Sequence, residues 1–172
     1  HLERYQEALD AYAKARELGI KRFDQLSSYE AAVLIRMGRL DEARDACQNA
    51  VRAGGSHPLP EYLGALVYTH RGSYADALTC VERALAEDER YLEALRLKGI
   101  VLLNLRRFPE AVEALDKTLS LHVDDAIAWT YRGAALLAQD ETKEAAISFE
   151  RALRLGAAFS AFILAGYSRA LL

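Results

Sequence analysis

The strongest constraint on this chain is a period of 34 residues that runs through most of its 172 residues. One column of the repeat is alanine throughout, at Ala43, Ala77, Ala111 and Ala145. A second column holds only small residues, at Ala31, Ala65, Gly99 and Gly133. Larger apolar residues recur in a third column, at Cys47, Val81, Leu115 and Phe149. Small residues let two backbones approach and larger ones fill the space between them. An irregular alanine-rich bundle would not keep these columns in step over four periods.

Each period contains two amphipathic stretches, with apolar residues at i, i+3, i+4 and i+7, which is the spacing of one helix face. Alanine and leucine dominate the composition and β-branched residues are scarce, which also favours helix. Gly38 and Gly72 separate the two stretches within a period. We predict first helices at 25–37, 60–70, 92–105 and 126–138, and second helices at 41–53, 74–86, 109–121 and 142–155.

The pattern resembles the tetratricopeptide repeat family, whose 34-residue unit reads W-x2-L-G-x2-Y and then A-x3-F-x2-A. Arg132 departs from the family pattern at its leucine position, and Ser27 and Glu61 stand where the family has tryptophan. The best-matching repeat begins at Ala126 and carries Trp129, Gly133, Leu136, Ala145, Phe149 and Ala152.

This resemblance implies an all-α fold, a right-handed superhelical solenoid of antiparallel helix pairs whose first helices line the concave face. We expect one array over residues 1–172, with a partial repeat at each end. Residues 1–23 would form the second helix of one partial repeat, and residues 160–172 the first helix of the other. The four full repeats would occupy 24–57, 58–91, 92–125 and 126–159.

No constellation of residues in the sequence points to catalysis. No histidine pairs with another histidine or with a cysteine at metal-ligand spacing, so we expect no metal and no cofactor. There is no phosphate-binding glycine loop and no G-x-S-x-G motif. We interpret Cys47 and Cys80 as small buried hydrophobic residues with reduced thiols. We therefore predict that the chain is not an enzyme.

Charge and hydropathy narrow the classes of partner. The formal net charge of −3 does not provide the basic excess of a nucleic-acid binder. No apolar run reaches the ~18 residues that a transmembrane helix needs, so we expect no membrane insertion. No signal peptide is evident, and we expect a cytoplasmic location.

What remains is a binding surface on the first helices. Helical geometry turns one stripe of each first helix toward the concave face. Three tyrosines in these stripes are rigid, amphipathic side chains of the kind that dominate binding energy. The alternative is that some of the side chains, above all the leucines, only pack between neighbouring first helices. The predicted peptide-binding groove comprises Tyr29, Arg36, Tyr62, Leu63, Leu66, His70, Arg96, Leu97, Ile100, Asn104 and Tyr131.

The resemblance also narrows the ligand. Members that bind acidic C-terminal tails carry a clamp of lysine, asparagine and arginine at defined repeat positions. Ser28, Ala32, Tyr62 and Leu66 stand at two of those positions here, so we predict no specific binding of acidic tails. The asparagine ladder of the glycosyltransferase members is also missing. A partner segment with apolar side chains, extended or helical, fits this groove better.

The apolar side chains of the last predicted helix indicate a second kind of contact, between copies of the chain. An exposed apolar helix face marks an interface or the cut end of a longer array. The terminal first helix of one molecule could dock on the initial second helix of another, which gives head-to-tail self-association. The residues proposed for this contact are Phe162, Ile163, Leu164, Tyr167 and Leu171.

The leading hypothesis is therefore a non-enzymatic scaffold that holds a partner peptide or helix in an apolar and aromatic groove. Two alternatives remain open at this stage. The chain could be the repeat module of a larger enzyme or of a secretion or chaperone system that recruits cargo, or it could be a self-assembling scaffold.

Overall fold

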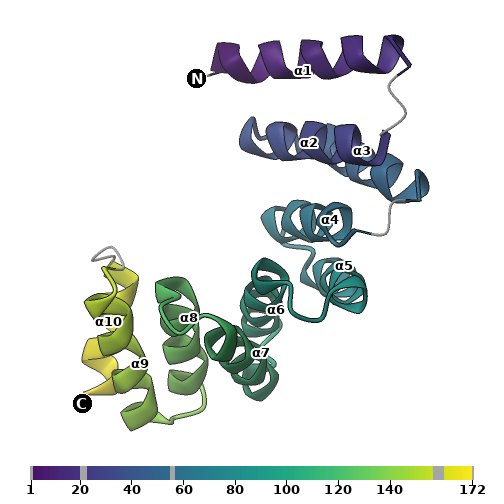
Figure 1. Ribbon diagram of the computed structural model, residues 1–172. Coiled ribbons are helices and arrows are strands. Elements are labelled where there is room, and N and C mark those ends of the chain that lie inside the picture. Colours follow the sequence, from purple (N-terminus) through teal and green to yellow (C-terminus); the bar gives the residue numbers. More distant parts are fainter. Residues whose placement is uncertain (1, 20–22, 55–56, 157–160, 172) are drawn as a thin grey trace. The chain divides into compact units, whose positions relative to one another are not determined.

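A computed structural model describes residues 2–19, 23–54, 57–156 and 161–171. All regular secondary structure within these ranges is helical, and it forms helices α1 to α10 (Figure 1). The chain divides into two compact units, His1–Glu89 and Arg90–Leu172. The all-α class predicted from the 34-residue period is confirmed.

The first unit contains two helical hairpins and one additional helix. The hairpins pair α2 (Phe23–Arg36) with α3 (Leu40–Arg52) and α4 (Leu59–His70) with α5 (Tyr74–Glu87). The additional helix is α1 (Leu2–Glu17), which packs on α2. Between the hairpins, α4 packs against both α2 and α3, so the two first helices lie side by side.

The second unit repeats this arrangement. Its hairpins pair α6 (Leu92–Asn104) with α7 (Phe108–Leu121) and α8 (Ala126–Leu137) with α9 (Thr142–Arg154). The last helix, α10 (Ala161–Ala170), packs on α8 and α9. In both units the hairpin helices agree with the predicted ranges, the largest difference being the start of α2 at Phe23 instead of residue 25.

The same turn joins the two helices of every hairpin. In each turn one residue lies in the left-handed region, with φ between 61° and 74°. These residues are Gly38, Gly72, Arg106 and Asp140. The amide after each of these residues donates to a carbonyl five residues earlier, as in Arg107 N to Leu102 O at 2.9 Å. This is the bond of a Schellman C-cap, which satisfies the carbonyls left open at a helix end.

The small and large columns of the repeat meet inside the hairpins. A Cβ atom at Gly99 would lie 2.5 Å from Cγ of Leu115, which is fully buried. A Cβ at Gly133 would lie 3.0 Å from the ring of Phe149, which is 1% exposed. Gly99 and Gly133 are therefore required by the side chains that cross over them.

Candidate functional site

In the first unit, most of the predicted groove residues form a stripe on α2 and α4 that we call the tyrosine face. It comprises Tyr29, Arg36, Tyr62, Leu66 and His70. Tyr29 is 50% exposed, and the side chains of Arg36 and His70 are exposed. Tyr62 and Leu66 are half-buried and pack against a core cluster that includes Leu34, Cys47 and Val67. This face therefore presents aromatic and apolar side chains whose inner edges are held by the core.

A small pocket of about 40 Å³ lies beside Tyr29 on this face. Ser28 contributes to its wall, but its hydroxyl donates to the carbonyl of Asp24 at 2.7 Å. The pocket also includes His57, whose Nδ1 accepts from the amide of Leu59 at 3.1 Å. His57 therefore satisfies an open amide at the start of α4, a role that its place in a loop did not reveal.

Two predicted groove residues belong to the interior instead. Leu63 and Leu97 are each 5% exposed, and Leu63 is a member of the core cluster of the first unit. A partner cannot reach these side chains without unpacking α4 or α6. Neither is part of the surface proposed below.

In the second unit, the predicted groove residues on α6 and α8 are engaged within the protein. Arg96 Nη1 donates to Oδ2 of Asp125 at 2.6 Å. The Asp125 side chain is only 4% exposed, and its other oxygen accepts from the amide of Ala128 at 2.9 Å as the N-cap of α8. Arg96 therefore neutralises a buried capping carboxylate and ties α6 to the start of α8.

The remaining predicted positions of the second unit differ in accessibility. Asn104 is exposed and donates to the carbonyl of Ile100 at 2.8 Å. Ile100 and Tyr131 are half-buried. Compared with the tyrosine face, this stripe offers fewer open side chains.

The structure describes only part of the predicted self-association surface. The side chains of Phe162 and Leu164 lie outside the described residues. Ile163 is 4% exposed and Tyr167 packs on the same cluster, which also contains Phe149. Leu171 is 63% exposed. Most of the described residues of this set thus face their own unit.

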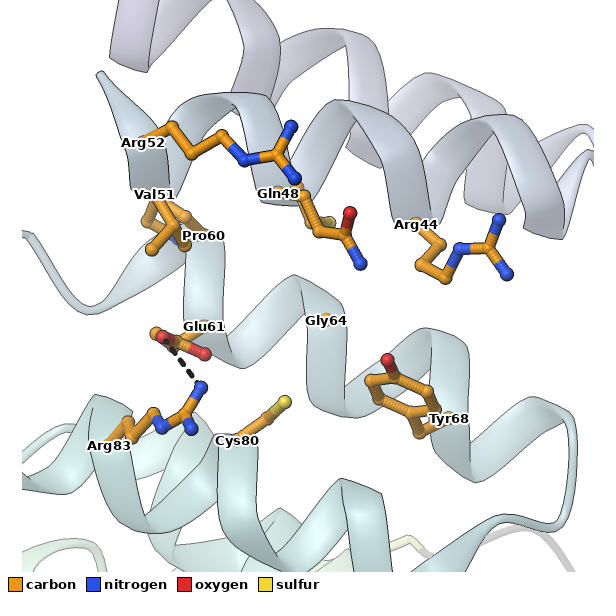
Figure 2. Close-up of a pocket in the computed structure, with 11 residues that line it drawn as sticks. Arg44, Gln48, Val51, Arg52, Pro60, Glu61, Gly64, Tyr68, Cys80 and Arg83 are labelled. Carbon is orange, nitrogen blue, oxygen red and sulfur yellow. Dashed lines mark ion pairs between the residues drawn. The ribbon is translucent and has the colours of Figure 1, made fainter. Parts of the chain in front are cut away.

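A pocket of about 200 Å³ that was not predicted from the sequence lies between α3, α4 and α5. We call it the Gly64 pocket, because Gly64 lies at the middle of its α4 wall, between Glu61 and Tyr68 (Figure 2). Both cysteines line it. Burial raises the pKa of the Cys47 thiol to about 12, and burial together with the Glu61 carboxylate raises that of Cys80 to about 11. Neither thiol is activated. Cys47 is buried, as predicted, whereas Cys80 is only partly buried.

At the equivalent place in the second unit, side chains form a cluster centred on Arg132. Its Nε donates to Asp116 at 2.6 Å and its Nη1 to the hydroxyl of Ser148 at 2.8 Å. The guanidinium carbon lies 5.6 Å from the centre of the Trp129 ring. Arg132, a departure from the family pattern, therefore holds α7, α8 and α9 together.

Two other kinds of site are absent from the described ranges. No described helix combines the length and apolarity needed to cross a membrane. No group of three or more His, Cys, Asp or Glu side chains among the described residues is arranged to hold a metal ion.

Repeated helical hairpins closed by one recurring turn define a helical-repeat protein. The sequence model of the tetratricopeptide repeat matches residues 1–58, 62–121 and 96–158. The chain belongs to the tetratricopeptide repeat family, as its motifs predicted. No curated protein sequence matches the chain.

Solved structures of the same fold agree with this assignment. A crystal structure of MamA is 20% identical, with a TM-score of 0.79 and 88% of each chain covered. YrrB, described as a TPR protein with an unusual peptide-binding site, is 21% identical with a TM-score of 0.78 over 96% of this chain and 84% of its own. Cut9, from a complex with Hcn1, is 17% identical with a TM-score of 0.86 over 98% of this chain and 33% of its own. At these identities the likeness concerns the fold.

Proposed function

We propose that this chain is a non-enzymatic protein-interaction module that binds a partner peptide or helix on the exposed faces of its first helices. Repeat proteins of this family stack their hairpins to create extended binding surfaces. The observation that carries the proposal is the tyrosine face, where Tyr29 is half exposed above a small pocket and Tyr62 is anchored on the core.

The side chains of this face favour an apolar or aromatic partner segment. Tyr29, Tyr62 and Leu66 offer rigid apolar area at low entropic cost, and Arg36 and His70 supply polar contacts at its edge. Such aromatic anchors commonly account for 2 kcal/mol or more of binding energy each, roughly a thirtyfold change in affinity. A helix or an extended strand of a partner could present side chains at matching intervals.

Acidic tails are not the expected ligand. The first TPR domain of RPAP3, 20% identical to this chain with a TM-score of 0.63 over 66% of this chain and 90% of its own, was solved with the HSP90 peptide SRMEEVD. The clamp residues that the family uses for such tails are replaced here, with Ser28 bonded to its own helix and Leu63 in the core. We expect no saturable binding of SRMEEVD by fluorescence anisotropy.

The test is affinity capture followed by quantitative mass spectrometry, with the wild type beside a Tyr29→Ala/Tyr62→Ala variant. A Tyr74→Ala variant is the matched control, because Tyr74 is half-buried at the start of α5, outside the tyrosine face. We expect partners to be lost from the double variant and kept by the control. Equal recovery of every partner by all three proteins would refute the proposed surface. Arg96→Ala is unsuitable here, because it would leave the buried Asp125 carboxylate without its counter-ion and so destabilise the fold.

A further inference from the structure

A cleft of about 380 Å³ lies on the α8–α9 hairpin of the second unit, and its apolar side chains are open to solvent. Ile147 on α9 is 61% exposed, and Val123, in the connection before α8, is 52% exposed. Trp129, near the start of α8, is half-buried and completes the apolar wall. We call this site the Ile147 cleft. Exposed apolar side chains that gather in one hollow are typical of a surface where another molecule docks.

The position of Ile147 is polar in the other hairpins. In α7, one period earlier, Glu113 forms an ion pair with Lys117 at 2.9 Å, an i,i+4 pair that stabilises a solvated helix face. In α9, isoleucine replaces the acid, so Arg151 lacks the carboxylate that the corresponding Lys117 has. The exchange creates apolar surface and leaves a cation beside it. The residues at this position in the other second helices are Asp45, Thr79 and Glu113.

Two contacts hold the Trp129 ring in place. Its Nε1 donates to the carbonyl of Val123 at 2.7 Å, so the polar atom of the ring is satisfied. The guanidinium carbon of Arg132 lies 5.6 Å from the ring centre, and Arg132 is itself bound to Asp116. A fixed aromatic side chain loses little entropy when a partner packs on it, and aromatic residues are frequent binding hot spots.

The rim of the cleft is basic. Arg151 and Arg154 line it, and Glu150 is the one carboxylate among the described residues of the lining. Glu150 is already paired with Arg154, at 2.6 Å. Arg151 is exposed and forms no ion pair within the described part of the chain. A complementary partner therefore carries a carboxylate beside its apolar side chains.

We propose that the Ile147 cleft binds an amphipathic helix of a partner protein, with large apolar side chains against Ile147 and Trp129 and an acidic side chain paired with Arg151. Ile147, Arg151 and Arg154 lie at i, i+4 and i+7, so this wall runs along two turns of α9 and can accept a helix laid beside it. An acidic tail as short as SRMEEVD cannot form such a helix. The cleft is separate from the tyrosine face, and the proposal does not depend on binding there.

The test uses Trp129, the one tryptophan in the sequence, as the reporter of binding to the full chain. The probe is an alanine-based helical peptide with leucines along one face and a glutamate beside each leucine. Two further peptides carry glutamine or lysine in place of the glutamates. We expect the acidic peptide to shift the Trp129 fluorescence to shorter wavelength in a saturable manner. It should bind about threefold more tightly than the glutamine peptide, the effect of one exposed ion pair, and the lysine peptide should bind least.

Three results of this titration would overturn the proposal. The first is the absence of a saturable shift with the acidic peptide. The second is a glutamine or lysine peptide that binds as tightly as the acidic one. The third is tighter binding of decanoate, which combines an apolar chain with a carboxylate and would assign the cleft to a lipid.

Three variants locate the binding, and all three change exposed positions, so each should fold. Ile147→Glu gives α9 the ion pair that α7 forms between Glu113 and Lys117, and it removes the apolar wall, so it should abolish the shift. Arg151→Gln should bind the acidic and glutamine peptides equally. Lys117→Gln is the matched control, because it removes the corresponding cation from α7, and it should bind as the wild type does. Undiminished binding by Ile147→Glu refutes the site.

The tyrosine face is tested separately with the same probe. The Tyr29→Ala/Tyr62→Ala variant should bind the acidic peptide as the wild type does, because both tyrosines lie in the first unit and Trp129 lies in the second. Loss of the Trp129 shift in this variant would overturn the assignment to the Ile147 cleft. Failure of the cleft variants to change binding leaves the tyrosine face untouched, because none of their positions lies on it.

Discussion

Two glycines in equivalent helices should respond in opposite ways to the same substitution. Gly64 in α4 and Gly99 in α6 both lie inside first helices and neither has a positive φ. Replacing either with alanine removes the entropic cost of glycine in a helix, a gain of ~0.8–1.0 kcal/mol. The two sites differ in what the new methyl group would meet.

At Gly64 the methyl group would lie 3.8 Å from Sγ of Cys80, an ordinary van der Waals distance. Gly64→Ala should therefore stabilise the protein by about 1 kcal/mol. At Gly99 the methyl group would lie 2.5 Å and 2.8 Å from Cγ and Cδ2 of Leu115. Leu115 is fully buried and cannot swing away, so overpacking should cost ~1–3 kcal/mol.

The entropic gain from replacing glycine with alanine in a helix is common to both variants and cancels when their free energies of unfolding are compared. Gly99→Ala should thus be ~1–3 kcal/mol less stable than Gly64→Ala. Urea unfolding of each full-length variant, followed by far-UV circular dichroism, measures this difference. A Gly99→Ala/Leu115→Ala double variant should show a favourable coupling energy, because the smaller side chain removes the clash. Gly99→Ala equal to or more stable than Gly64→Ala would refute the reasoning.

Three further predictions concern single groups. Arg106 holds a left-handed conformation at φ 61°, so Arg106→Gly should stabilise the chain by roughly 1 kcal/mol, measured by the same urea unfolding; a loss of stability would contradict the turn assignment. Arg96→Ala should destabilise the second unit by ~1–3 kcal/mol, because the Asp125 carboxylate is buried and loses its cation, whereas Arg96→Ala/Asp125→Asn should recover part of that loss. In the folded chain the pKa values of Cys80 and Cys47 are raised from 9.0 to about 11 and about 12. The unfolded chain therefore releases these protons at lower pH, and the free energy of unfolding should fall as the pH rises from 9 toward 11. Replacing both cysteines with alanine should flatten this pH dependence in thermal melts.

The helices could be predicted from the sequence because their signals are local and repeated. Apolar spacing marks each helix, and the columns through Ala111 and Gly99 record where helices cross. The turn at Arg106 carries no glycine, and only the turns one period away indicate that it is the same turn. Repetition supplied information there that the individual residues lack.

The candidate site was less predictable, because accessibility depends on contacts between repeats. Helical geometry alone predicted that Leu63 and Leu97 face the groove, but both side chains are buried. Arg96 looked like a binding residue until its partner Asp125, 29 residues later, was placed beside it. The Gly64 pocket had a signal in the sequence, a glycine where another repeat has Arg132. The residue type alone does not show whether neighbouring side chains fill the space above it.

The recurring turn also determines where such a chain can change in length. Each hairpin closes within three or four residues through a bond that fixes the last carbonyls of one helix against the next, as at Gly72 and Arg106. One residue inserted into either helix would rotate the following side chains by about 100° and move buried positions toward solvent. Connections between hairpins, such as Ala53–Pro58, carry no such bond among their described residues. Natural insertions and engineered tags should accordingly be accepted between hairpins and rejected within them.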